Sequence, residues 1–349
     1  MLPITVGLFI AHAISSFEKH APLFIVSIFL FEIFSNSISI FYAFGCGHVA
    51  AGSLHIMEPL HSADSFSPLW RLGVIKPGWW SAEKGTLMGL VLGLTAAFLA
   101  PSFRPLLTKG KEVAEWVLTR IFARLIPLFI LGFVARMDQT HLFTQVFSQY
   151  ADFLLWLTLF LLVYIGVLFL IASGFSLISF IKSIKNLLPA AGISFSSGCS
   201  LSTMPWTIEG TSKNLQNSEL AKSVIPVTTN VQQVGDCIAN AFLCFLIYLH
   251  FYGDAPSLAI WIPFSIVFVL ARFATAAVLG GAIFVMLPIY ESYLHFTPDM
   301  IAIILAFNVL LDPIITCSNV VANGALCRIF ERVWIFVLRR FAVLKNPSL

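Results

Sequence analysis

Long apolar runs alternate with short polar connections along most of the chain. Runs long enough to cross a membrane as helices occupy residues 22–44, 113–136 and 150–175, and a shorter run occupies 84–100. The opening run, 1–15, is short for a span and predicts a trimmed or interfacial helix. The pattern predicts an all-α polytopic membrane protein.

After residue 175 the apolar runs shorten to about 12–15 residues and are interrupted by small and polar clusters. "IKSIKNLLPAAGISF" leads into "SSGCS", and "PFSIVFVLARFATAAV" leads through "LGG" into "AIFVMLPIYES". Runs of this length favour re-entrant hairpins over complete spans, and each pair precedes a polar-studded span, 220–252 or 298–325. Paired interrupted segments are typical of transporter binding sites, so we expect a site near them.

Composition supports membrane insertion and excludes several other classes of protein. The chain is 58% hydrophobic and only 11% charged, whereas soluble domains are about 25% charged. Its net charge of +3 comes from dispersed residues, so no nucleic-acid surface is expected. Six scattered cysteines without a C-x-x-C pair predict neither a disulfide framework nor a zinc site. We find no nucleophile–base pair or helical metal motif in a span, so no enzyme is expected.

The distribution of basic residues predicts a topology. Connections 253–261 and 293–299 contain no Lys or Arg, whereas the segment 326–349 is rich in Arg. By the positive-inside rule we expect that segment to be a cytoplasmic tail of a protein in the plasma or inner membrane. The same rule places on the cytoplasmic side the connections that carry Lys19, Arg104, Lys109, Lys111, Lys182, Lys185, Lys213 and Lys222.

A polar stripe runs along the last predicted span, in "LLDPIITCSNVVANG", residues 310–324. At 100° per residue, Asp312, Thr316, Asn319 and Asn323 fall within an arc of about 60°, and Asn308 extends the stripe. Amides and hydroxyls alone would indicate hydrogen bonding between membrane helices. A carboxylate at mid-membrane costs about 2.5–3.5 kcal/mol and usually marks an ion or substrate path, so Asp312 favours a functional site.

Small hydroxylated residues surround Gly198 in "SFSSGCSLSTMP", residues 194–205. A turn of this kind directs backbone N–H groups and hydroxyls toward one point, where a carboxylate can bind. The alternative is a plain serine-rich loop. Its position between two apolar half-spans favours the binding interpretation, because polar groups at membrane depth need partners.

Polar residues also interrupt the span at 224–237, "VIPVTTNVQQVGDC". Pro226 and Gly235 favour an unwound centre, whose carbonyl groups suit a hard cation such as Na⁺. A polar packing seam is an equally good interpretation. The candidate oxygen donors are Thr228, Asn230, Gln232, Asp236, Asn319 and Asn323.

From residue 3 to 335 the order of these features resembles the dicarboxylate/amino acid:cation symporter family, the glutamate-transporter-like proteins. "SSGCSL" is similar to the family's first hairpin tip, normally three serines before small-Thr-Leu-Pro. "VLGGA", 278–282, is similar to the second tip, normally Val-Pro-Gly-Ala-Gly. "LLDPIITCSNVVANG" resembles the last helix, normally Leu-Asp-x-x-Arg-Thr-x-x-Asn-x-x-Gly-Asp. The resemblance implies that the family's first helix and part of its second are missing here.

The resemblance implies an elevator fold with two re-entrant helical hairpins and a broken transmembrane helix, assembled as a homotrimer in the bilayer. Within the single domain 1–349, the scaffold part would be mainly 1–20 and 80–140, and the moving part 21–45 and 150–330. Asp312 would hold a substrate amino group, Asn319, Ser196 and Ser197 its carboxylate, and Thr316 would line the pocket. The implied substrate site comprises Ser196, Ser197, Gly198, Val278, Gly280, Asp312, Ile315, Thr316 and Asn319.

Departures from the family motifs modify this expectation. Ile315 and Phe195 stand where members that carry acidic substrates have an arginine, so a bidentate partner for a second carboxylate is missing. Val234 and Asn323 stand where the family has sodium-binding aspartates, and Asp236 is displaced by two positions. We therefore expect a carrier of a small neutral amino acid, with no cofactor. Coupling to Na⁺ or H⁺ stays open, and a symporter of dicarboxylates, glutamate or aspartate is the alternative.

Overall fold

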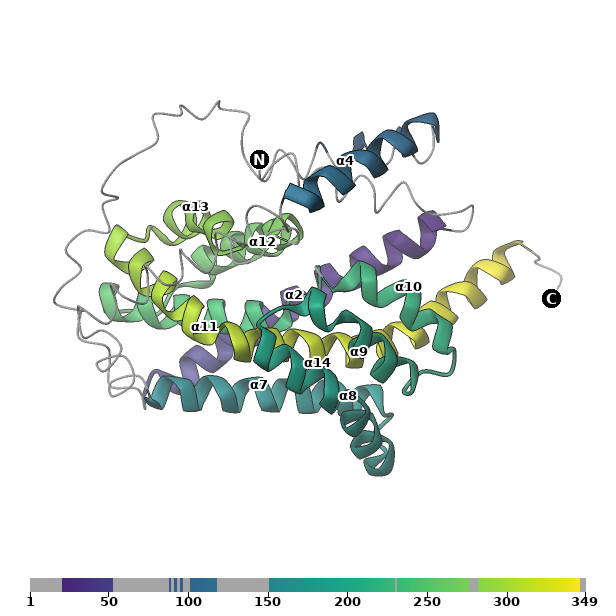
Figure 1. Cartoon of the computed structure of the whole chain (residues 1–349). Coiled ribbons are helices and arrows are strands. Elements are labelled where there is room, and N and C mark those ends of the chain that lie inside the picture. The colour runs from purple at the N-terminus through teal and green to yellow at the C-terminus, as the bar shows by residue number, and fades with distance from the viewer. Residues whose placement is uncertain are drawn as a thin grey trace. The chain divides into compact units, whose positions relative to one another are not determined.

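A computed structural model describes residues 21–52, 88, 91–92, 95–96, 101–117, 151–229, 231–275 and 282–345. Every regular element in these ranges is helical, which confirms the all-α prediction for them (Figure 1). The elements are α2 (Ala21–Ala50), the 3-10 turn η1 (Pro101–Phe103), α4 (Arg104–Val117), α7 (Ala151–Ala172), α8 (Leu177–Ser197), α9 (Ser200–Ser212), α10 (Ser218–Thr228), α11 (Val234–Tyr252), α12 (Leu258–Thr275), α13 (Ala282–Leu294) and α14 (Pro298–Lys345).

Three of the described helices are long and apolar enough to cross a membrane: Val26–Ala50, Ala151–Ala172 and Val234–Tyr252. Two of them correspond to the predicted spans at 22–44 and 150–175. Leu155, Leu159 and Leu162 on α7 are exposed, as expected for a face in contact with lipid. The predicted runs at 1–15 and 118–136, and most of 84–100, lie outside the described residues.

Both predicted hairpins are present as pairs of packed helices, α8 with α9 and α12 with α13. The first pair turns at Gly198, whose φ of 58° ends α8 and whose N–H donates to the Ser194 carbonyl at 2.9 Å. Cys199 is extended and leads into α9. The tip of the second pair, with Val278 and Gly280, lies outside the described residues.

The predicted break in the polar span is also present. α10 ends at Thr228 and α11 begins at Val234, so the helical ladder stops between them. Pro226 lies in the last turn of α10, where it removes one backbone donor. The break leaves backbone groups that must find partners from neighbouring side chains.

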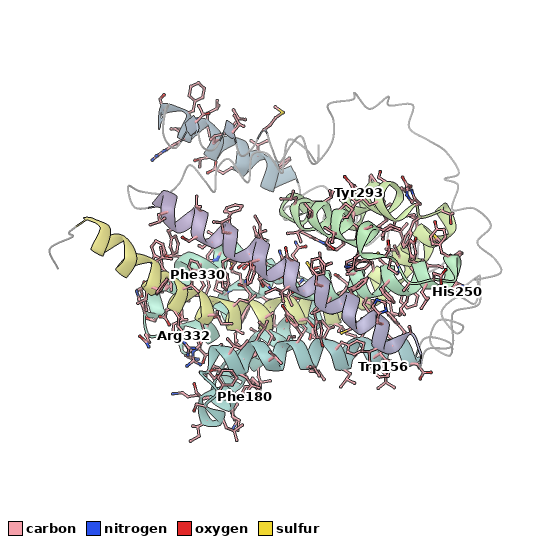
Figure 2. All side chains as sticks on the ribbon, turned by 180° about the vertical axis from the view of Figure 1, so that it is seen from behind. Trp156, Phe180, His250, Tyr293, Phe330 and Arg332 are labelled. Carbon is pink, nitrogen blue, oxygen red and sulfur yellow. The ribbon has the colours of Figure 1, made fainter. Side chains whose placement is uncertain are left out.

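α14 is a continuous helix of 48 residues, with Pro313 inside it. It passes through residue 326, where we expected a separate tail to begin. Arg332 donates to the carbonyl oxygens of Ile171 and Ala172 at 3.0 and 2.8 Å, at the last turn of α7 (Figure 2). The first part of the expected tail therefore contacts α7, and its cytoplasmic location stays a prediction.

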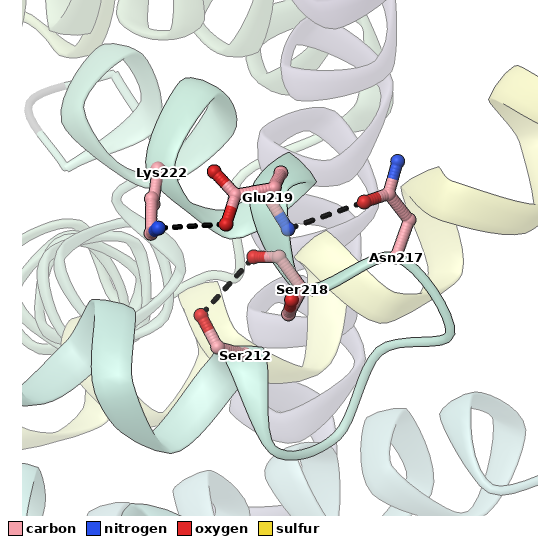
Figure 3. A network of polar contacts seen from close by, with 5 residues as sticks. All are labelled: Ser212, Asn217, Ser218, Glu219 and Lys222. Carbon is pink, nitrogen blue, oxygen red and sulfur yellow. Dashed lines mark hydrogen bonds and ion pairs between the residues drawn. The ribbon is translucent and has the colours of Figure 1, made fainter.

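A loop links α9 to α10 and anchors the base of the first hairpin. The Asn217 side chain accepts from the Glu219 N–H at 3.2 Å and caps α10, and Lys222 pairs with Glu219 at 2.7 Å (Figure 3). Glu331 of α14 accepts from the backbone N–H groups of Gln216 and Asn217 at 3.1 and 2.7 Å. A charge-assisted pair of this kind holds the loop to α14.

The chain divides into two compact units. Unit 1 comprises Met1–Glu18, Phe44–Trp156 and Phe242–Val309, and unit 2 comprises Lys19–Ala43, Leu157–Ala241 and Leu310–Leu349. The boundaries fall inside α2, α7, α11 and α14, so each of these helices contributes to both units. The division into a scaffold and a moving part stays a prediction.

Unit 2 has an apolar core between α2, α10 and α14. It is made of Ile28, Ala221, Val224, Ile225, Cys327 and Phe330, all buried. Phe330 packs edge-on against Phe24 and Phe31 of α2, with ring centroids 5.7 and 5.5 Å apart. This core holds α2 beside the first hairpin, the helix break and the polar stripe of α14, which all belong to unit 2.

Candidate functional site

The Asp312 carboxylate lies at the tip of the first hairpin. A Cβ built on Gly198 would lie 3.2 Å from Asp312 Oδ2, so the backbone of the tip approaches this oxygen closely. Gly198 also has a positive φ of 58°, which other residues rarely adopt. The Thr316 hydroxyl hydrogen bonds to the carboxylate, and Asp236 is near enough to repel it electrostatically. Asp312 itself is exposed, so the carboxylate is held but accessible.

The two hairpin serines bond within their own hairpin. Ser196 donates to the Gly192 carbonyl at 2.8 Å, and Ser197 accepts from the Cys199 N–H at 3.3 Å. Both side chains are exposed, and they line an open hollow of about 550 Å³ on α8 with Leu188, Pro189, Gly192 and Ile193. The hollow does not include Asp312. Ser196 would have to release Gly192 before it could donate to a bound carboxylate.

Asn319 joins α14 to the start of α11. Its side-chain oxygen accepts from the N–H groups of Gly235 and Asp236 at 2.8 and 3.4 Å, and its Nδ2 donates to Asp236 Oδ2 at 2.7 Å. Asn319 thus acts as a cap for α11, whose first N–H groups have no helical partner. An amide has two N–H donors, so the bond to Asp236 uses one of the two.

Gly235 allows α11 and α14 to approach. A Cβ at this position would lie 2.6 Å from the Ile315 carbonyl oxygen and 2.9 Å from Ser318 Cβ. The Ile315 side chain is 2% exposed in this packed seam. The sequence placed Ile315 at the substrate, and the structure places its side chain inside unit 2; direct contact with substrate stays a prediction.

The residues expected to bind sodium form a hydrogen-bonded set. Thr228 donates to Asn323 Oδ1 at 2.8 Å, next to the break. In the orientation that satisfies both its groups, the Gln232 amide donates to the Asn319 carbonyl at 2.9 Å and accepts from the Val234 N–H at 3.3 Å. Asn230 lies outside the described residues.

Several groups of this set already have partners within the protein. The Asn319 and Asn323 side-chain oxygens already accept protein hydrogen bonds, and the oxygens that remain are mostly neutral. Val234, which the resemblance aligns with a sodium-binding aspartate, is an apolar side chain with 0% exposure. The described residues also contain no group of three His, Cys, Asp or Glu side chains suited to a metal. A packing seam and a cation site both stay predictions for this segment.

The sequence analysis missed a second polar stripe, on α2. Its members occur at spacings of three and four and are at most 5% exposed: Glu32, Ser35, Asn36 and Ser39. The helical period that identified the stripe of α14 also identifies this one. The stripe lies within the predicted span 22–44, which was identified only from the length of its apolar run.

Two members of the α2 stripe hold neighbouring elements. Asn36 donates to the Val231 carbonyl at 3.0 Å and accepts from the Gln233 N–H at 3.3 Å, so it supplies partners inside the helix break. Ser39 bonds to the Tyr164 hydroxyl of α7 at 3.0 Å. The α2 stripe thus connects α2 to the helix break and to α7 within unit 2.

These features define a helical membrane protein in which a helix break and a hairpin tip meet polar stripes. The profile of the Sodium:dicarboxylate symporter family matches residues 86–333, well over half of the chain. The chain therefore belongs to this family of multi-pass membrane symporters, and its fold is that of the family. No curated protein matches the chain significantly.

Proposed function

We propose that the chain is a secondary active transporter that carries a small amino acid, with preference for neutral over acidic side chains. The proposal rests on the accessible Asp312 carboxylate beside the Gly198 turn. A carboxylate in this position suits the ammonium group of an amino acid, and the turn offers N–H and hydroxyl groups for its carboxylate.

The local charge favours a neutral substrate. Segments 194–205 and 310–324 contain no Lys or Arg. A glutamate, aspartate or dicarboxylate would bring an additional carboxylate close to Asp312, and a desolvated carboxylate without a cation is costly. Arg328, the nearest basic residue after this segment of α14, donates to Ser183 and Ser179 on α8 at 2.6 and 3.0 Å. Its guanidinium is thus committed to the hairpin base.

The mode of transport follows from family membership. We infer an elevator type of alternating access, in which the first hairpin, α14 and the helix break move together as part of the carrier. A homotrimer in the plasma or inner membrane with a cytoplasmic C-terminus is the corresponding assembly. The hydrogen bonds that join these elements within unit 2 are consistent with movement as one body.

A binding screen tests the substrate class. The thermal unfolding of the purified full chain would be measured with neutral amino acids, aspartate, glutamate and succinate, each with Na⁺ or K⁺. A ligand at one hundred times its Kd adds about 2.7 kcal/mol of stability, which raises Tm measurably. We expect alanine, serine or a larger neutral amino acid to raise Tm. Stabilisation by aspartate or succinate alone would overturn the neutral preference, and the dicarboxylate alternative would replace it.

Reconstituted vesicles test transport itself. Uptake of the radiolabelled ligand that raises Tm most would be followed against an excess of unlabelled competitors. Saturable uptake that the unlabelled ligand abolishes supports a carrier. Ion currents that no amino acid affects would instead indicate a channel and contradict the proposal.

A further inference from the structure

The α2 stripe contains a carboxyl group that no other role accounts for. Glu32 is 2% exposed, and its Oε2 has no hydrogen-bond partner among the described residues. The hydroxyl of Ser35, one turn away, also has no partner there. Buried polar atoms without partners are uncommon in folded proteins and call for an explanation.

The orientation of α2 shows that this burial is built into the helix. Val26, Leu30, Phe34 and Ile38 are exposed and follow each other at intervals of four, which makes one lipid-facing side. At 100° per residue, Glu32 lies on the opposite side, with Asn36 and Ser39. Glu32 therefore points into unit 2, away from lipid.

Among the described residues, the helices packed around Glu32 form no ion pair with it. The preceding turn of α2 contributes Ile28 to the apolar core with α10 and α14. Cys327 on α14 is near enough to both Glu32 and Glu331 for an electrostatic interaction, and Glu331 binds the loop N–H groups. A second anionic group does not stabilise a carboxylate.

Several charged groups on the neighbouring elements have other partners among the described residues. On α10, Lys222 pairs with Glu219 at the exposed surface. On α14, Arg328 binds serines of α8 and Arg332 binds carbonyl groups of α7. On α11, Asp236 binds Asn319. Within the described part of the chain, no Lys, Arg or His forms an ion pair with Glu32.

A carboxyl group in such surroundings is most readily accommodated as the neutral acid. Burying a carboxylate without a partner is costly, and ionisable groups inside membrane proteins often belong to proton relays. Asn36, one turn along α2, holds the helix break through Val231 and Gln233. A change in the charge of Glu32 would thus occur one helical turn from Asn36, whose hydrogen bonds hold the helix break.

We propose that Glu32 is the binding site of the coupling proton in this transporter. The proposal rests on the proposed transport function and adds the ion that drives it. One O–H bond forms when Glu32 takes a proton from water on one side, and the same bond breaks when the proton is released on the other. The neutral acid is the form that suits the buried position of Glu32 in unit 2, where it has no cationic partner among the described residues.

Vesicle uptake tests the coupling. With a substrate carried together with one proton, an inward gradient of about one pH unit can drive about tenfold accumulation. We expect such accumulation for the wild type without Na⁺. Glu32→Gln, which keeps the shape of the neutral acid, should retain substrate exchange across the membrane but lose the accumulation driven by the pH gradient. Glu32→Asp should retain part of it.

Matched controls separate coupling from folding. Glu219→Gln removes an exposed carboxylate on α10, and Ser35→Ala removes the other unpartnered group on α2; both should keep the accumulation. Accumulation by Glu32→Gln at the wild-type level would overturn the proposal. So would wild-type accumulation that follows a Na⁺ gradient and ignores the pH gradient.

Infrared spectroscopy gives a readout that does not need a substrate. A buried protonated carboxyl group has a C=O stretch above the amide bands, and it can be assigned by comparing two variants. We expect a band in the wild type near neutral pH that is absent in Glu32→Gln and present in Glu219→Gln. If this band is present and no amino acid is transported, the transport proposal fails while the proton site stands. If the band is missing, the proton site is overturned whatever the uptake.

Discussion

The polar stripes of α14 and α2 are alike in sequence and differ in how their groups are paired. On α14, Asp312 bonds to Thr316, while Asn319 and Asn323 bond to groups at the helix break. On α2, Asn36 and Ser39 have partners, but Glu32 Oε2 and Ser35 Oγ have none among the described residues. A satisfied network fixes helices, whereas an unpartnered buried group indicates where a state can change.

The two stripes therefore suggest different roles. The stripe of α14 combines an accessible carboxylate with a rigid frame, which is what recognition of a small ligand requires. The stripe of α2 is buried. It carries Glu32, whose carboxyl group can gain or lose a proton and forms no ion pair among the described residues. The two proposals place binding and coupling on different helices, in the segments of α14 and α2 that belong to unit 2.

The largest effect is expected from Asp312→Asn. Asparagine keeps the size of the side chain and removes the charge that we propose holds the substrate ammonium group. A bound substrate would shield this charge pair from water, and loss of one partner of a shielded pair costs about 2–5 kcal/mol, so substrate affinity should fall at least about 30-fold. Isothermal titration with the best ligand of the screen measures this loss.

The control for this change is Asp152→Asn, at an exposed carboxyl in the first turn of α7. It should bind substrate as the wild type does, and both variants should keep the wild-type helix content. An Asp312→Asn protein with normal affinity would remove the basis of the proposed substrate site.

Gly235→Ala should produce the next largest effect, by separating α11 from the stripe of α14. The added methyl group would lie 2.6 Å from the Ile315 carbonyl oxygen and 3.0 Å from Asn319 Oδ1. Overpacking of this kind costs about 1–3 kcal/mol and should lower Tm and substrate affinity together.

Gly166→Ala in α7 is the matched control, because nothing lies within 4 Å of a Cβ there. Alanine is favoured over glycine inside a helix, so Tm should stay level or rise. If both substitutions change Tm equally, the close approach at Gly235 does not hold the two helices in register.

The sequence predicted the framework of the site because the framework depends on local signals. Gly198 turns the first hairpin, and Pro226 with Gly235 accompanies the break between α10 and α11. Gly198 and Pro226 act through their own backbone geometry, which is why their effect can be predicted without a structure. The spacing of Asp312 and Thr316 likewise predicted a shared helix face, and the two side chains are bonded.

The pairing of polar groups could not be predicted, because it depends on which helices meet. Nothing in the sequence indicates that Asn319 caps α11 or that Arg328 reaches serines of α8. The basic residues after 326 suggested a tail in water, yet Glu331 is 4% exposed because it binds a loop. The distribution of basic residues predicts on which side of the membrane a segment lies, and it does not predict tertiary contacts.

Thr228→Val is expected to have a moderate effect, confined to stability. The hydroxyl is buried and donates to Asn323 Oδ1 at 2.8 Å, so valine leaves that oxygen without a donor. An unsatisfied buried acceptor costs about 1–3 kcal/mol, which should appear as a lower Tm. Thr229→Val is the comparison, because that hydroxyl donates at 2.6 Å to the Ile225 carbonyl, a backbone group of its own helix. Equal losses in the two variants would contradict a special role for the pair.

Ser35→Ala should have the smallest effect, and it tests the contrast between the stripes most directly. The Ser35 hydroxyl is buried and has no partner in the described part of the chain, so its removal relieves a desolvation cost and breaks no bond. The free energy of unfolding should change by less than about 0.5 kcal/mol, so Tm should stay nearly constant or rise. Ser39→Ala, one turn further along α2, removes the hydroxyl bonded to Tyr164 and should lower stability by about 1 kcal/mol. If Ser35→Ala destabilises the protein as much as Ser39→Ala does, Ser35 has a partner after all. The stripe of α2 would then be a packing network like that of α14, with Glu32 as its one unpartnered member.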